Sequence, residues 1–378
     1  MQYYALTPQD AWFFRDGRPY NHGESNQADV ESLFPPPART RTGALRAALA
    51  RANGWNGLSG GWPQAVADAF GHGPNDLGAL QFTGPFLIRG HRAGQGNALW
   101  PLPRHLLGKV EPGRWTPTAF LRPAEQPTET DRGTLILPEA SLPTDERSGL
   151  KPAESAWVTR AGLTNILAGR LPAVDAISQP PDLWRTESRV GLKREEATLT
   201  VGEGDLYSPA YVRLCKGVAL GLALSGVPTG MNGLPNLFPL GGESRLAQCD
   251  LWNSDALPPA PDAGTLAPDA SGQVRFIVVL LTPGKVPATQ SSIENAEVVS
   301  ACMGRPLLIG GWDSLRRESL PLEPFLPAGS VWFCRAAVDT VRQVLCRHGG
   351  WIGEYTRHGF GQIAIGRWPQ PHSVPATP

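Results

Sequence analysis

The chain has 378 residues, of which 41% are hydrophobic, and its 34 basic and 34 acidic side chains give a formal net charge of +0 at pH 7. This balance excludes a uniformly basic surface, so any nucleic-acid site must be local. The length allows two domains of ordinary size. The 43 Gly and 38 Pro predict many loops and short elements.

The first 52 residues are predicted to run from a strand through an arginine-bearing loop and a rigid proline segment into a helix. Residues 3–6 form an apolar strand, Asp16-Gly17 is a turn dipeptide, and three prolines at 35–37 hold the backbone extended. Apolar side chains then recur at helical spacing, with Thr42 as a plausible N-cap. These side chains are Leu45, Ala48, Leu49 and Ala52.

The next segments supply the other elements of a first unit. Residues 63–70 are predicted to form a short helix, and residues 79–88 and 98–102 two strands of a hairpin. A polar, proline-rich insertion follows at about 122–155, after which Thr159 is expected to cap a short helix. The buried face of that helix would be Leu163, Ile166 and Leu167.

A second insertion, at about 184–204, has the alternation of a protruding β-hairpin. Val190 and Leu192 alternate on one limb and Leu199 and Val201 on the other. Its tip would carry Lys193 and Arg194 together with two glutamates, and a strand at 207–214 follows. The order strand, helix, strand, strand, helix, strand is that of a βαββαβ, ferredoxin-like unit, here spanning residues 1–215.

The remainder, 216–378, is predicted to be a second ferredoxin-like unit. Residues 218–224, 274–281 and 331–334 are strand candidates, and residues 338–346 have the apolar spacing of a helix. A glycine-rich turn and a last strand at 362–368 end the unit. The predicted fold class is therefore α+β, with two ferredoxin-like units and long loop and β-hairpin insertions.

Four arginines make the best candidate site for a nucleic acid. Arg15 and Arg18 flank the Asp-Gly turn, while Arg39 and Arg41 follow the proline segment at the start of the helix, whose dipole also favours phosphate. The aromatic side chains beside them can stack on bases or belong to the core, and we favour the core. Arg15 can instead pair with an aspartate. The aromatic residues are Phe13, Phe14 and Tyr20, and the aspartates Asp10 and Asp16.

The glycine-rich turn before the last strand is a second candidate. In Gly359-Phe360-Gly361 the two glycines would let an RNA backbone approach the main chain, with Arg357 at a phosphate. An ordinary tight turn explains the same pattern. At the hairpin tip, Lys193 and Arg194 are further candidates, although the adjacent glutamates cancel their charge.

The runs FFRDGRPY and LFPPPARTRTGALRAAL resemble the amino-terminal signature of the third subunit of the Cmr (type III-B) CRISPR effector complex, a family in the RAMP superfamily of RRM-like RNA-binding proteins of the 5′-handle-binding group. Later matches occur in the family's order at 204–207, 240–245, 309–313, 327–331 and 359–361. The resemblance implies a non-catalytic subunit that holds the 5′ repeat-derived handle of crRNA. It also implies a hetero-oligomeric assembly with the large polymerase-like signalling subunit and the first backbone subunit.

Two main alternative functions stay open, and a third has a weaker basis. A metal-independent RNA endonuclease that matures the guide would use a histidine, and His22 and His358 are the candidates. Asp16 and Glu24 are possible paired carboxylates of a glycosidase, a weaker pattern. A scaffold that binds protein only is the second alternative. Walker, H-E-x-x-H and G-x-S-x-G motifs are absent from the sequence.

Cysteine usage and hydropathy indicate the compartment. The five cysteines are too scattered for zinc-type pairs, and no apolar run of roughly 18 residues is present. We therefore expect a reduced, cytoplasmic protein without a membrane span, a metal or a cofactor.

Overall fold

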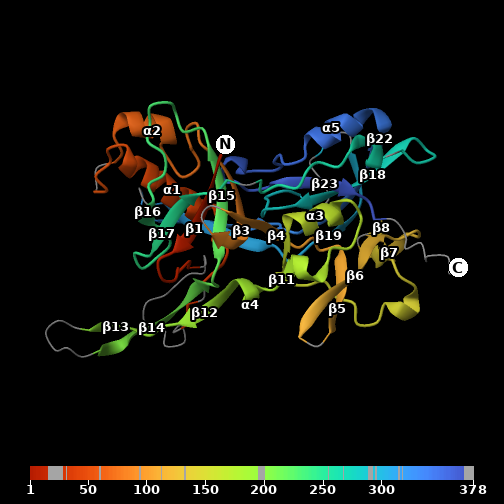
Figure 1. Cartoon of the computed structure of the whole chain (residues 1–378), viewed down its shortest axis with the longest axis horizontal. Coiled ribbons are helices and arrows are strands. Elements are labelled where there is room, and N and C mark those ends of the chain that lie inside the picture. Colours follow the sequence, from red (N-terminus) through yellow and green to blue (C-terminus); the bar gives the residue numbers. More distant parts are fainter. Residues whose placement is uncertain are drawn as a thin grey trace. The chain divides into compact units, whose positions relative to one another are not determined.

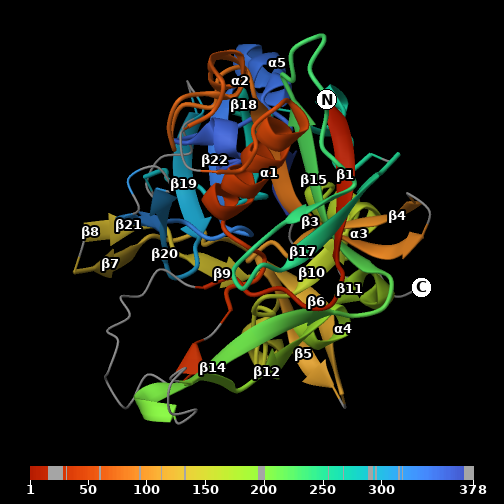
Figure 2. The same ribbon diagram turned by 90° about the vertical axis from the view of Figure 1, so that its left-hand side faces the viewer.

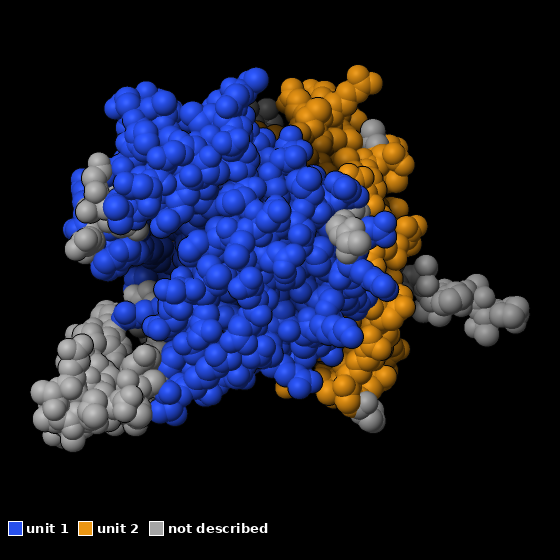
Figure 3. Space-filling model, turned by 60° about the vertical axis from the view of Figure 1, so that its left-hand side comes forward, with its two compact units in different colours: residues 1–96, 180–254, 308–323 blue, residues 97–179, 255–307, 324–378 orange. Residues whose placement is uncertain are grey.

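Short strands make up most of the regular structure, as the glycine and proline content predicts. The computed structural model describes residues 1–15, 29–30, 32–58, 61–92, 95–111, 113–131, 133–194, 201–253, 255–266, 268–287, 293, 296–313, 316 and 318–369, and only the backbone of 29–30, 191–194, 201–207 and 263. The chain divides into unit 1 (1–96, 180–254, 308–323) and unit 2 (97–179, 255–307, 324–378), coloured separately in Figure 3. The fold is mixed α/β, with strands predominating.

The sheet of unit 1 places the amino-terminal strand at its centre. Neighbouring strands follow the order β3-β15-β1-β17-β16, each antiparallel to the next, with Leu6 of β1 opposite Leu220 of β15. The elements are β1 (Gln2–Pro8), α1 (Ala38–Ala52), α2 (Gln64–Phe70), β3 (Gln81–Arg92), β15 (Val218–Ser225), β16 (Leu237–Pro239) and β17 (Leu246–Leu251).

Both faces of this sheet are covered along β15. Successive residues of β15 point to opposite faces, yet all of Val218–Leu224 are buried. On α1 the predicted apolar face is buried, with Leu45 and Leu49 fully so. Position 221 accommodates only glycine, because the Phe86 ring occupies the space of a side chain: a Cβ there would lie 2.1 Å from the ring. No wide, open sheet face is left along this central strand.

A ribbon of strands belongs to the same unit and carries the predicted hairpin. β12 (Trp184–Ser188) and β13 (Gly191–Arg194) both pair antiparallel with the long strand β14 (Val201–Leu214), and Leu192 lies opposite Leu206. The predicted pairing of the two limbs is thereby confirmed. Figures 1 and 2 show the ribbon projecting beyond the sheet of unit 1. β2 (Asp29–Val30) pairs parallel with β14.

Unit 2 has its own four-stranded antiparallel sheet in the order β19-β22-β18-β23. The strands are β18 (Gln273–Leu280), β19 (Ala296–Cys302), β22 (Val331–Ala337) and β23 (Ile363–Arg367), and α5 (Val341–Cys346) packs nearby. The β-branched run of β18 is buried on both faces from Phe276 to Leu280. This confirms the predicted central strand.

The other elements of unit 2 surround that sheet. α3 (Arg160–Leu167) begins as predicted, because the Thr159 hydroxyl accepts a hydrogen bond from the Gly162 N–H at 3.1 Å. Strands β4 (Gln95–Pro101), β10 (Trp157–Thr159) and β11 (Ile177–Ser178) lie side by side. A further sheet contains β5 (Leu106–Glu111), β6 (Arg114–Pro123) and β9 (Pro138–Ala140).

The short elements that remain are β7 (Thr128–Thr130), β8 (Gly133–Leu135), α4 (Pro180–Leu183), β20 (Leu307–Asp313) and β21 (Glu318–Phe325), together with 3₁₀ turns at Thr144–Glu146, Val174–Ala176, Ala263–Leu266, Val338–Thr340 and Thr356–His358. β7 pairs with β8, and β20 with β21. The predicted insertion at 122–155 thus contains β7, β8 and β9.

Several elements differ from the sequence prediction. α1 begins at Ala38, directly after Pro37, because proline suits the residue before a helix; Thr42 is buried inside the helix and is not its N-cap. α5 begins at Val341 and is preceded by a 3₁₀ turn. β15, which the prediction assigned to residues 216–378, pairs with β1 and β3 in unit 1. Among the described helices, none is long and apolar enough to cross a membrane.

Candidate nucleic-acid interface

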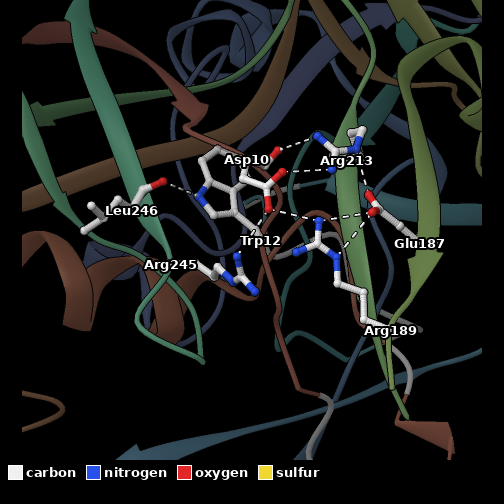
Figure 4. A network of polar contacts seen from close by, with 7 residues as sticks. All are labelled: Asp10, Trp12, Glu187, Arg189, Arg213, Arg245 and Leu246. Atoms are coloured by element: carbon white, nitrogen blue, oxygen red, sulfur yellow. Dashed lines mark hydrogen bonds and ion pairs between the residues drawn. The ribbon is translucent and has the colours of Figure 1, made fainter. Parts of the chain in front are cut away.

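Three arginines converge on one aspartate at the base of the ribbon. Figure 4 shows this arginine cluster, which comprises Asp10, Glu187, Arg189, Arg213 and Arg245. The Asp10 carboxylate accepts from Arg213 Nη2 at 2.8 Å, from Arg189 Nη2 at 2.9 Å and from Arg245 Nη1 at 3.3 Å. Glu187 accepts from Arg213 Nε at 2.7 Å and from Arg189 Nη2 at 3.0 Å. Four segments distant in sequence thereby meet at one point.

The backbone around Trp12 holds these segments together. The Trp12 N–H donates to the Val212 carbonyl at 2.9 Å, and the Val212 N–H donates back at 2.7 Å. The Trp12 indole Nε1 donates to the Leu246 carbonyl at 3.3 Å (Figure 4). Trp12, Phe13 and Phe14 are all buried, which confirms that Phe13 and Phe14 belong to the core, whereas Tyr20 lies outside the described residues. Asp10 is therefore fixed beside β14 by a buried anchor two residues away.

A tyrosine lies against two of the arginines. The guanidinium carbon of Arg245 is 4.5 Å, and that of Arg189 is 4.9 Å, from the centroid of the Tyr211 ring. Phe13 packs against the same ring at a centroid distance of 5.6 Å. Cation–π contact at such distances favours a fixed guanidinium plane. Both arginines are thus held in place while their side chains keep part of their surface exposed, 25% for Arg245 and 33% for Arg189.

The cluster has more cationic than anionic groups. Three guanidinium groups face two carboxylates, which leaves an excess of one positive charge. Hydrogen bonds from Arg213 and Arg189 lower the pKa of Asp10 and of Glu187, so both carboxyls are ionised at neutral pH. Arg213 uses Nε, Nη1 and Nη2 within the cluster. Arg245 uses only Nη1 there, and its buried Nε has no acceptor among the described residues.

The four predicted amino-terminal arginines have different surroundings. Arg15 is exposed and forms a β-bridge with Ser32, whereas Arg18 lies outside the described residues. The Arg39 side chain is 6% exposed and pairs with Glu323, its Nη2 lying 2.8 Å from the carboxylate oxygen. Asp10, a predicted alternative partner of Arg15, is bound by the three arginines of the cluster.

Arg41 is fully buried. Its Nη2 donates to the Gly84 carbonyl at 2.6 Å, while Nε and Nη1 have no partner among the described residues. Burial lowers the pKa of Arg41 to about 9. A phosphate contact from this side chain would need the start of α1 to open, and neither Arg41 nor the paired Arg39 belongs to the arginine cluster. Their predicted RNA contacts stay predictions.

The predicted cations of the hairpin lie at the edge of what the structure describes. Lys193 and Arg194 are on β13, where only the backbone is described, and the predicted glutamates of the tip lie outside the described residues. Asp16, His22 and Glu24, the residues of the catalytic alternatives, also lie outside them.

The glycine-rich turn is a tightly packed part of unit 2. Gly359 and Gly361 have φ angles of 94° and 73°, the left-handed region that favours glycine. A Cβ on Gly361 would lie 1.9 Å from the Ile352 carbonyl oxygen. Phe360 is 1% exposed and packs on Phe325 at a centroid distance of 4.5 Å. Arg357 is exposed, so it is the member of this motif whose side chain reaches the surface.

Chemistry beyond binding has few candidates in the described part of the chain. His358 is 3% exposed, and no group of three His, Cys, Asp or Glu residues among those described is placed to hold a metal ion. Burial raises the pKa of the Cys249 and Cys302 thiols to about 12. These two cysteines are therefore unreactive thiols at neutral pH.

The arginine cluster was missed by the sequence analysis except for Arg245, which lies in the matched motif at 240–245. Glu187, Arg189 and Arg213 were read only as part of the hairpin region. The strand register supplies the missing information, because Glu187 lies opposite Tyr211 on β14. Side chains two residues apart on a strand share a face, which brings Arg213 to Glu187.

Comparison with known proteins identifies relatives of the whole chain. The family model described as CRISPR-associated protein (Cas_Cmr3) matches residues 4–368. A cryo-EM structure of the type III-B Cmr-beta bound to cognate target RNA and AMPPnP contains a chain with a TM-score of 0.51 at 15% identity, covering 98% of this chain and 100% of that one. A second, bound to cognate target RNA, gives 0.51 at 14% identity with the same coverage. No curated protein sequence matches.

Proposed function

This chain belongs to the Cas_Cmr3 family of CRISPR-associated proteins, the family of the third subunit of type III-B Cmr effector complexes, and we propose that it is a non-catalytic subunit that holds RNA. Its ligand is the 5′ repeat-derived handle of crRNA, and it joins the large polymerase-like signalling subunit to the first backbone subunit. The observation that carries the proposal is the arginine cluster at the base of the ribbon.

The cluster has the chemistry that a phosphate needs. Arg189 and Arg245 are held by carboxylates and by the Tyr211 ring, so less side-chain entropy is lost when they bind an anion. Guanidinium groups suit phosphate because their N–H groups form a planar fork. One positive charge remains after the two carboxylates are counted. Because the net charge of the chain is +0, an RNA site needs a local excess of positive charge, and the cluster has one.

The fold favours RNA binding by the loops and the ribbon over binding by an open sheet face. We propose that each unit is a ferredoxin-like variant, since in both the four central strands lie in the chain order second, third, first, fourth and are antiparallel throughout. RRM domains stack RNA bases on an open sheet face. Here β15 and β18 are buried on both faces. RNA is therefore gripped at the cluster, along the ribbon and by exposed loop side chains such as Arg15 and Arg357.

The ribbon also gives a reason for the hetero-oligomeric assembly. A projecting ribbon of strands presents backbone edges that can pair with another chain. We expect this ribbon to lie against the guide or an adjacent subunit. Deleting residues 192–197 should then leave the melting temperature of the isolated chain unchanged while the assembled complex becomes less stable.

The test uses the purified full-length chain and its reconstituted complex with radiolabelled repeat RNA, with and without EDTA. Retention of intact handle RNA by the complex, and weaker retention by the chain alone, is the expected result. Cleavage insensitive to EDTA would replace the proposal by the endonuclease alternative. Assembly without any contribution of the chain to RNA retention would replace it by the protein-only scaffold.

A further inference from the structure

Two partly exposed tryptophans lie between α1 and α2, and each has an arginine over its ring. We propose that this surface, the tryptophan platform (Arg46, Arg51, Trp55 and Trp62), is a second binding site for single-stranded RNA. It is separate from the arginine cluster in sequence and rests on the proposed function only in taking the same class of ligand. Arg51 binds a phosphate, and an unpaired base packs on the exposed parts of the two indoles.

Arg51 is the phosphate-binding residue of the platform. Its guanidinium carbon lies 5.0 Å from the centroid of the Trp55 ring. On Gly57 a Cβ would lie 2.4 Å from Arg51 Nη1, so the guanidinium packs against backbone that only glycine leaves open. The side chain is exposed, and the described residues offer it no acceptor. A cation is thus held at the surface with no anion beside it in the described part of the chain.

Arg46, the other arginine of the platform, is held by hydrogen bonds to the backbone. Arg46 donates to three backbone carbonyls, those of Phe70, Gly71 and Gly73, each at 2.8 Å. Its guanidinium carbon lies 5.1 Å from the centroid of Trp62. These bonds tie α1 to the carboxyl end of α2, which lies beside it (Figures 1 and 2), and hold the Arg46 guanidinium in place against the Trp62 ring.

The two indoles form one surface. Their ring centroids are 6.2 Å apart and their planes are inclined by 56°. The Trp55 backbone N–H donates to the Ala50 carbonyl at 2.9 Å, which fixes the chain as it leaves α1. The Trp55 Nε1 is buried and has no acceptor among the described residues, so packing rather than hydrogen bonding orients the ring. Leu58, three residues further along the chain, is 68% exposed.

The chemistry favours RNA over a protein segment. Sites for single-stranded nucleic acid combine a cation for the backbone with aromatic rings on which bases stack, and such stacking tolerates any base. An acidic peptide would satisfy Arg51 but would leave the indoles without a planar partner. The two rings next to an unpaired guanidinium therefore match a nucleotide, with its phosphate and its base, better than a carboxylate alone.

The test measures binding of a fluorescently labelled oligo-uridine to the full-length chain by anisotropy. Trp55→Leu should raise the Kd about 5- to 100-fold, because stacking contributes that much per base, and Trp55→Tyr should restore most of the affinity. Arg51→Ala should flatten the slope of log K against log salt by about 0.7. The matched control is Trp312→Leu, which removes an indole that is 62% exposed elsewhere in unit 1 and should leave the Kd unchanged.

Two outcomes would overturn the inference. In one, Trp55→Leu and Arg51→Ala both bind as the wild type does; in the other, RNA affinity stays intact while assembly with the other subunits fails, which identifies a protein contact. If Trp55→Leu does not fold, Arg51→Glu decides, because that side chain is exposed.

Loss of binding in Arg189→Ala/Arg245→Ala but not in Trp55→Leu would reject the platform alone. A wild-type complex that retains no RNA would reject the proposed function as well.

Discussion

The Arg213 guanidinium contacts Asp10 twice: Nη2 lies 2.8 Å from the carboxylate Oδ1, and Nη1 donates to the backbone carbonyl of the same residue at 3.2 Å. A side chain of β14 thereby holds the segment that follows β1. The same guanidinium donates to Glu187 on the neighbouring strand β12. Arg213 is thus the structural arginine of the cluster, and Arg189 and Arg245 have donors left for a ligand.

The Arg213–Asp10 pair should be measurable in a double-mutant cycle. Both side chains are 43% exposed, so solvent screens the pair and the coupling in urea unfolding should be about 0.2–1 kcal/mol. The cycle compares Arg213→Ala, Asp10→Ala and the double variant. Strictly additive effects would show that the contact contributes nothing to stability.

The Arg39–Glu323 pair should contribute to stability. Removing one partner of a buried pair leaves the other charge without compensation. Because the Arg39 side chain is 6% and the Glu323 side chain 22% exposed, Arg39→Ala should cost about 3 kcal/mol, the lower end of the range for buried pairs. Thermal melting checks this, and an unchanged melt would contradict it. Arg39→Met with Glu323→Gln should recover part of the loss.

The glycine-rich turn should depend on Gly361 for packing. In Gly361→Ala, a Cβ would meet the Ile352 carbonyl oxygen at 1.9 Å in addition to the cost of positive φ, so the loss should be about 3 kcal/mol or more. Gly113→Ala is the matched control in the same unit, with φ +79° and nothing within 4 Å of the new Cβ. It should lose only about 1–2 kcal/mol. Equal losses in urea unfolding would show that the close approach is relieved elsewhere.

His105 should make the stability of unit 2 fall in acid. Its imidazole is fully buried, stacks on Phe120 at 5.2 Å and has no hydrogen-bond partner among the described residues, and burial lowers its pKa from 6.5 to about 3. The unfolded chain therefore binds a proton between these two pKa values that the folded chain does not. Stability falls as pH drops through that window, by up to about 1.4 kcal/mol per pH unit.

The variant His105→Phe isolates this effect, because it keeps a ring of similar size and cannot titrate. The difference in urea midpoint between wild type and variant should be constant above about pH 6.5 and should grow in favour of the variant below it. Parallel curves over the whole range would mean that His105 has the same pKa in the folded and the unfolded chain.

How far the sequence predicts this fold depends on the range of the interaction. The Thr159 cap, the apolar run of β18 and the hairpin limbs depend on neighbours in the chain, and all three are found. The position of β15 beside β1 depends on pairing between residues more than 200 apart, which local periodicity cannot specify. For the site, charge and spacing identified arginines near α1. Which of these arginines are exposed depends on how the fold packs. Arg41 is fully buried, although its place in the sequence does not distinguish it from an exposed arginine.

The cluster was hidden for the same reason. Asp10 and Arg213 are separated by 203 residues, and neither has a charged sequence neighbour that predicts the pair. Two backbone hydrogen bonds between Trp12 and Val212 bring them together. A chain without net charge can therefore form a local cationic site when strand pairing brings its arginines together.

The salt dependence of handle RNA binding tests the central claim most directly. In the reconstituted complex, Arg189→Ala/Arg245→Ala removes the two arginines with free donors, and each lost phosphate contact on single-stranded RNA should flatten the slope of log K against log salt by about 0.7. For this double variant the account predicts a slope flatter by about 1.4 and weaker binding. The variant Arg189→Lys/Arg245→Lys should give values between those of the wild type and the alanine variant. The control Arg342→Ala, which removes an exposed arginine on α5, should change neither. A double variant that assembles normally and keeps the wild-type affinity and slope would contradict the claim that the arginine cluster holds the RNA.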